Sequence, residues 1–118
     1  MINTEDFERE LIERGYIKYK PSPFKDDCVT DSFQKVIKDD SNKRKYFVDW
    51  DKWDFSRYVD ANHPDLNNPA FEGSTQLTTK DGEVVDITLH AGWGIKKAEE
   101  FLAKLFDTGW FKLYDNDY

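Results

Sequence analysis

At positions 46–55 the chain reads Tyr46-Phe47-Val48-Asp49-Trp50-Asp51-Lys52-Trp53-Asp54-Phe55, so that six large apolar side chains are interleaved with three aspartates and one lysine. Tyr46, Val48 and Trp50 recur at every second position, which is the side-chain period of a β-strand. A strand here would bury these three side chains on one face and leave the aspartates near its end. The run therefore predicts one strand of a sheet that lies against a core.

The neighbouring sequence predicts two antiparallel hairpins. Residues 33–38 and 45–50 have the composition of strands, and they flank a cluster of turn formers at 39–43. A second pair of strands is expected at 71–79 and 83–90, joined through Lys80-Asp81-Gly82, because Asp-Gly is a strong signal for a tight turn.

The sequence also predicts two helices. Residues 4–14 follow the capping candidates Asn3 and Thr4, and acidic residues in the first turn favour the positive end of the helix dipole. Residues 94–108 repeat apolar side chains at helical spacing, and Gly109 is suited to the position after the helix.

Strands bracketed by helices indicate an α+β fold. We expect a four-stranded, mainly antiparallel sheet made of the two hairpins, with the N-terminal and the C-terminal helix packed on one face. A chain of 118 residues has the length of one domain, so we expect a single compact domain over 1–118, with 115–118 as a short tail.

The charge balance argues against some classes of partner. The chain has 24 acidic and 17 basic residues, a net charge of −7, whereas binding to a phosphate backbone needs an excess of cations. No direct binding to nucleic acid is expected, and a basic protein surface is the favoured partner. The oligomeric state stays open.

The lack of a signal-peptide pattern and the single cysteine favour the cytoplasm. The N-terminus lacks the pattern of a signal peptide, and no apolar run approaches the roughly 18 residues of a membrane span, so we expect a cytoplasmic protein with no membrane association. Cys28 is the single cysteine, which excludes a disulfide or a thiolate zinc site within one chain.

Three aspartates in the opening run are the candidates for a metal site. Asp49, Asp51 and Asp54 offer the carboxylate oxygens that calcium and magnesium prefer. No glycine turn follows them, however, and Lys52 lies among them, so we expect solvated carboxylates and no metal site. No motif for a cofactor occurs either, and none is expected.

His63 and His90 are the only histidines, and histidine is the side chain most often used for general acid–base catalysis. Asp86 has the same strand parity as His90, and Asp65 lies beside His63. No serine or cysteine occupies a nucleophile turn, so a structural or surface role is expected for both histidines. The alternative function is a small-molecule enzyme with a His/carboxylate site under a loop at 56–70.

The leading hypothesis is a small acidic protein-binding module without catalytic activity. A narrower version is an inhibitor or immunity-type accessory protein that covers a basic surface of another protein. Tryptophan and tyrosine often anchor interfaces, and the aspartates beside them would complement a basic partner. The candidate partner-binding residues are Asp49, Trp50, Asp51, Trp53, Asp54 and Tyr58.

Overall fold

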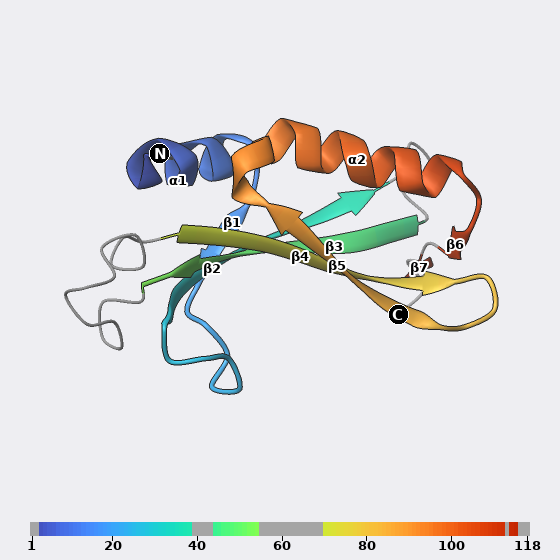
Figure 1. Ribbon diagram of the computed structural model, residues 1–118, viewed down its shortest axis with the longest axis horizontal. Helices are drawn as coiled ribbons and strands as arrows, with labels where there is room; N and C mark the ends of the chain where they lie inside the picture. The colour runs from blue at the N-terminus through green and yellow to red at the C-terminus, as the bar shows by residue number, and fades with distance from the viewer. Residues whose placement is uncertain (1–2, 39–43, 55–69, 113, 116–118) are drawn as a thin grey trace.

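A computed structural model describes residues 3–38, 44–54, 70–112 and 114–115 (Figure 1). It has an α+β fold with an antiparallel sheet, as predicted. The elements, in chain order, are α1 (Thr4–Glu13), β1 (Ile17–Tyr19), β2 (Val29–Lys38), β3 (Arg44–Trp53), β4 (Ala70–Thr79), β5 (Val84–His90), η2 (Ala91–Trp93), α2 (Ile95–Asp107), β6 (Phe111–Lys112) and β7 (Tyr114–Asp115).

The sheet has the strand order β1-β2-β3-β4-β5, in which β2 with β3 and β4 with β5 form the two predicted hairpins. The predicted number of four strands is too low, because three short strands join the sheet. β1 pairs with β2. β6 pairs with the C-terminal end of β4, and β7 pairs with the N-terminal end of β3. Two- and three-residue strands are too short to show a periodic pattern in sequence. Asp115, which was expected in the tail, belongs to β7.

Both predicted helices are confirmed. The side chain of Asn3 caps α1, because its Oδ1 accepts hydrogen bonds from the backbone N–H groups of Glu5 at 3.0 Å and Asp6 at 3.2 Å. α2 begins after Gly94, whose φ of +83° suits glycine. The two helices lie on the same side of the sheet (Figure 1), and their apolar side chains join one core with the strands. No helix in the described ranges is long and apolar enough to cross a membrane.

The centre of the core is a row of four residues across four strands. Phe33 pairs with Trp50, Trp50 with Gly73, and Gly73 with Leu89. Phe33, Trp50 and Leu89 are fully buried. A Cβ atom on Gly73 would lie 2.9 Å from the indole carbons of Trp50 and from Cβ of Leu89. A glycine at this position therefore lets the Trp50 ring lie across β4.

We expect Gly73→Ala to lower the free energy of unfolding by about 2 kcal/mol, because the added methyl group would overpack the core. Gly92→Ala is the matched control, since nothing lies within 4 Å of a Cβ there, and its effect should stay within about 0.5 kcal/mol. Urea denaturation followed by circular dichroism measures both. Equal stability of the two variants would contradict the close contact.

Candidate functional site

The side of the sheet opposite to the two helices is called the open face below, and no helix of the described ranges covers it (Figure 1). Asp49 and Asp51 flank Trp50 in β3, and successive side chains of a strand point to opposite faces. Because Trp50 points into the core beneath the helices, both aspartates point to the open face. The register places Gln34 and Ser74 beside Asp49, and Ser32 and Glu72 beside Asp51.

Lys25 reaches both aspartates from the loop between β1 and β2, which projects below the sheet in Figure 1. Its Nζ lies 2.5 Å from Oδ2 of Asp49 and 2.6 Å from Oδ1 of Asp51. Ser32 completes the group, since its Oγ lies 3.3 Å from the lysine Nζ and 2.8 Å from Oδ1 of Asp51. We call Lys25, Ser32, Asp49 and Asp51 the Lys25 cluster. It holds two carboxylates and one ammonium group.

The protonation of the cluster follows from its burial and its charges. Burial raises the pKa of Asp49, and the negative charge of Asp51 raises it further, while Lys25 lowers it in part. Burial disfavours the Lys25 ammonium, but its hydrogen bonds and charge interactions with the two aspartates outweigh burial, and the pKa of Lys25 is raised. Oδ1 of Asp49 is buried and has no hydrogen-bond partner in the described part of the chain. In the cluster, two carboxyl groups share a single ammonium group.

Short hydrogen-bonded turns hold the loop that presents Lys25. The backbone N–H of Lys25 donates to the carbonyl of Ser22 at 3.0 Å, and the N–H of Val29 donates to the carbonyl of Asp26 at 3.0 Å. Cys28 is buried at the end of the loop and its N–H donates to Oδ1 of Asp26 at 2.8 Å. These bonds fix the turns on both sides of Lys25 and leave its neighbour Phe24 97% exposed.

Exposed apolar side chains lie beside the cluster on the open face. In the register, Tyr19 pairs with Ser32, and Ile17 pairs with Gln34, which lies beside Asp49. Val36 pairs with Phe47, two positions before Asp49 in β3. Each of these four apolar side chains keeps more than a third of its surface exposed. With Phe24 they form what we call the apolar rim, made of Ile17, Tyr19, Phe24, Val36 and Phe47. Apolar side chains gathered in this way often mark an interaction site.

The structure separates the residues predicted to bind a partner. Asp49 and Asp51 lie together on the open face, where Lys25 holds them. Trp50 has to be removed from the candidate surface, because it is fully buried on the other face, where the period-two pattern of β3 directs it. Trp53 is half-buried at the end of β3.

The last two predicted residues follow β3. Asp54 is half-buried, and its backbone N–H donates to the carbonyl of Cys28 at 2.8 Å. Tyr58 lies outside the described residues. Trp53, together with residues 70–72, lines a pocket of about 310 Å³ at this end of the sheet.

The candidate metal ligands do not converge on one point. Asp49 and Asp51 share the ammonium group of Lys25, which occupies the position a cation would take between them. Within the described ranges, no group of three or more His, Cys, Asp or Glu side chains is arranged to hold a metal ion. The oxygen atoms of the Lys25 cluster bind an ammonium group instead.

His90 is exposed at the end of β5 and lies directly opposite Glu72 in the register. Its ring contacts Trp93, with centroids 5.1 Å apart. Asp86 has the same parity, but four positions along a strand separate two residues by about 13 Å, so it does not reach His90 directly. His63 and residues 56–69 of the predicted loop lie outside the described residues.

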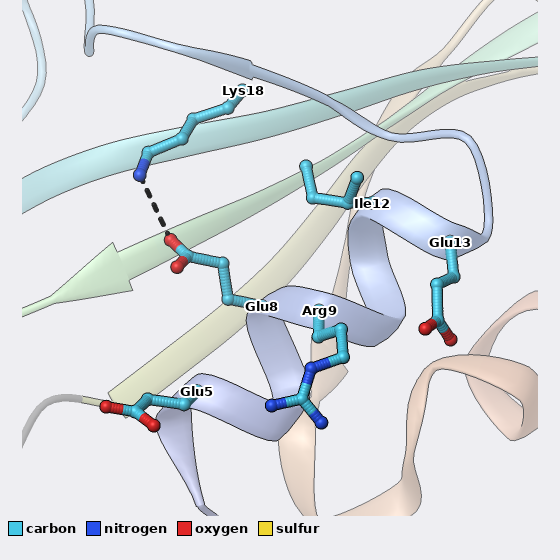
Figure 2. Close-up of a pocket in the computed structure, with 6 residues that line it drawn as sticks. All are labelled: Glu5, Glu8, Arg9, Ile12, Glu13 and Lys18. Atoms are coloured by element: carbon cyan, nitrogen blue, oxygen red, sulfur yellow. Dashed lines mark ion pairs between the residues drawn. The ribbon is translucent and has the colours of Figure 1, made fainter.

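A second hollow, of about 420 Å³, lies between α1 and β1 (Figure 2). Figure 2 shows Lys18 and Glu8 pointing toward each other, with Nζ and Oε1 3.2 Å apart, whereas the side chains of Glu5, Arg9 and Glu13 spread outward along the helix. Charged groups that diverge in this way do not meet the geometric need of catalysis, which brings acid, base and substrate within hydrogen-bond reach.

Sequence reasoning misses Lys25, which binds the two aspartates of the open face, and its exposed neighbour Phe24. Lys25 precedes Asp26 and Asp27, so by sequence it reads as one charge in a polar loop. Its true partners are 24 and 26 positions away. Only the two prolines at positions 21 and 23 hint that this loop has a fixed course.

Comparison with known proteins adds no family to this picture: no family model, no curated protein and no solved structure matches the chain. The function therefore has to be argued from the chemistry of the open face.

Proposed function

We propose that this protein is a small binding module without catalytic activity, and that its open face docks on a basic surface of another protein. The observation that supports this most is the apolar rim beside the carboxylates of Asp49 and Asp51, on a face that neither described helix covers. A module that covers a basic surface would act as an inhibitor or immunity-type accessory protein. Such a protein needs complementarity and no reactive groups.

The charge of the open face supports a basic partner. Among the described residues of the strands, this face carries the carboxylates of Asp49, Asp51, Glu72 and Asp86 and the ammonium group of Lys112, and the loop adds the ammonium group of Lys25. The net charge of the whole chain, −7, has the same sign. Opposite charge on the partner would speed the encounter and reject acidic surfaces.

The apolar rim supports the same function. Tight protein interfaces depend on a few large side chains that become fully buried, surrounded by polar groups that exclude water. Phe24 is 97% exposed and belongs to a loop held by the Lys25 cluster, so the backbone that carries it loses little freedom when it binds. Phe24 is therefore the side chain we expect to contribute most to affinity.

We expect Phe24→Ala to weaken binding to the partner by about 30-fold, the effect of losing one hot-spot aromatic. The partner is first captured from a lysate of the source cells on tagged protein and eluted with a salt gradient. Its dissociation constant is then measured by calorimetry with wild-type and variant proteins.

The matched control is Ile12→Ala, since Ile12 is half-exposed on α1, on the other side of the sheet, and its loss should leave affinity unchanged. A partner that is released only by denaturant and not by salt, and that binds Phe24→Ala as tightly as wild type, would refute the proposal.

A further inference from the structure

The two edges of the sheet differ in how well they are protected against pairing. β1 forms one edge over only three residues, and prolines follow it at positions 21 and 23. Short strands and prolines are the usual means by which proteins block an edge. β5 forms the other edge over seven residues, Val84–His90, and contains neither proline nor lysine. No described strand covers this second edge, which can therefore accept another strand.

The hydrogen-bond pattern shows which residues of β5 present their backbone outward. The N–H of Thr79 donates to the carbonyl of Glu83 at 2.8 Å, which fixes the hydrogen-bonded pairs of the β4–β5 ladder. In an antiparallel ladder, hydrogen-bonded pairs alternate with pairs whose N–H and C=O groups point away from the partner strand. Residues 84, 86, 88 and 90 therefore direct their N–H and C=O groups to the outer edge, where no described strand pairs with them.

The side chains along β5 define what an added strand would need. On the helix side, Val85 and Ile87 are only partly covered. At the end of β5, the contacting rings of Trp93 and Phe101 extend this apolar surface and are 45% and 39% exposed. On the open face, the exposed side chains of β5 are those of Val84, Asp86, Thr88 and His90, and Asp86 is the acidic one. The β4–β5 turn adds the acidic residues Asp81 and Glu83 and the basic residue Lys80.

We propose that an extended segment of the protein partner adds to β5 as a further strand, with apolar side chains toward α2 and basic side chains on the open face. This inference deepens the proposed function and rests on it. The outward N–H and C=O groups would supply backbone hydrogen bonds, and the two rows of side chains would supply specificity. The segment is recognised by its strict alternation of basic and apolar residues.

A second copy of the chain fits this edge less well. In a symmetric antiparallel pair centred on Ile87, Asp86 of each copy would be a diagonal neighbour of Asp86 of the other on the same face. Each copy also carries a net charge of −7. Like charges at this distance oppose pairing, whereas a basic strand would be attracted by the same residues.

The test uses the full chain with three seven-residue peptides: one with lysine at odd and isoleucine at even positions, one with glutamate in place of lysine, and one with the composition of the first in blocks. We expect the alternating basic peptide to bind at least about 10-fold more tightly than the other two. In hydrogen exchange, the amides of Asp86 and Thr88 should gain protection with that peptide. Equal binding of all three peptides would overturn the proposal, as would protection that grows with protein concentration alone.

Two variants locate the peptide on the edge. Thr88→Pro removes an outward N–H and leaves the hydrogen bonds between β4 and β5 intact. It should therefore weaken binding of the alternating peptide by at least about 10-fold. Asp86→Lys keeps every backbone group and should weaken binding of this peptide by a similar factor, and the affinity that remains should depend less on salt. Unchanged affinity in Asp86→Lys refutes the proposal even if Thr88→Pro does not fold.

The same variants separate this inference from the proposed function. If capture of the natural partner depends on Phe24 but not on Thr88 or Asp86, the open face binds the partner and the strand addition is wrong. If capture depends on neither Phe24 nor salt, the proposed function itself fails, whatever the peptides do.

Discussion

Replacement of Trp50 by alanine is expected to lower the free energy of unfolding by about 4 kcal/mol, the cost of removing a large buried aromatic side chain from a core. Trp50 is fully buried, and its ring packs edge-on against Phe7, with centroids 5.3 Å apart. Its indole Nε1 has no hydrogen-bond partner in the described part of the chain, so the loss is one of packing. The cavity left between α1 and the sheet cannot close fully, because Gly73 brings no side chain to fill it.

Denaturation in urea, followed by circular dichroism, measures this change, and the slope of the transition should stay constant. Trp110→Ala is the control, since Trp110 is 65% exposed and its loss should cost no more than about 0.5 kcal/mol. If Trp50→Ala does not fold, Trp50→Phe still fills most of the space and should lose about 2 kcal/mol. A Trp50 variant as stable as Trp110→Ala would show that the ring is not a core residue.

The role of Trp50 shows how far periodicity alone predicts this fold. Alternation in 46–50 indicates a strand with one buried face, and the β-hairpins and helices follow from turn residues, caps and spacing. The same alternation places Trp50 opposite to Asp49 and Asp51, which contradicts the prediction that all three residues contact one partner surface. A strand cannot present Trp50 and both aspartates on the same face.

The Lys25 cluster could not be predicted because it depends on contacts between distant segments. Lys25 is placed over Asp49 by the course of a loop, and the composition of that loop gives no sign of its end point. The pairing of the short strands has the same cause, since β6 and β7 form where β4 and β3 leave backbone groups without another partner strand. Local propensity specifies helices and strands, whereas the position of Lys25 and the pairing of the short strands come from tertiary packing.

Lys25→Met is expected to lower the free energy of unfolding at pH 7 by about 3 kcal/mol, because it leaves two neighbouring carboxylates without a cation. Methionine keeps the apolar stem, so the change is mainly one of charge. The side chains of Lys25 and Asp49 are about one quarter exposed, which places the loss at the lower end of the range for a broken buried ion pair. Lys20→Met, an exposed lysine of the same loop, is the control and should be nearly neutral.

The dependence on pH distinguishes charge from packing. In the wild type the folded state binds the Asp49 proton more tightly than the unfolded state, because the pKa of Asp49 is raised above 3.8. Stability contributed by this group therefore falls as pH rises from about 3.8 through the raised value. Without Lys25 the pKa of Asp49 should rise further, so the deficit of Lys25→Met should be small near pH 3 and complete at pH 7. At alkaline pH the deficit should shrink again, since the wild type loses its ammonium group above 10.5, where the raised pKa of Lys25 lies.

Lys25→Met/Asp49→Asn tests the excess charge directly. With one carboxylate removed, Asp51 no longer faces a like charge, and the double variant should recover most of the stability lost in Lys25→Met at pH 7. A deficit that is the same at pH 3 and pH 7, and is not recovered by Asp49→Asn, would show that Lys25 acts through packing alone. Recovery would show that the loss in Lys25→Met comes from the repulsion between two carboxylates that have lost their shared cation.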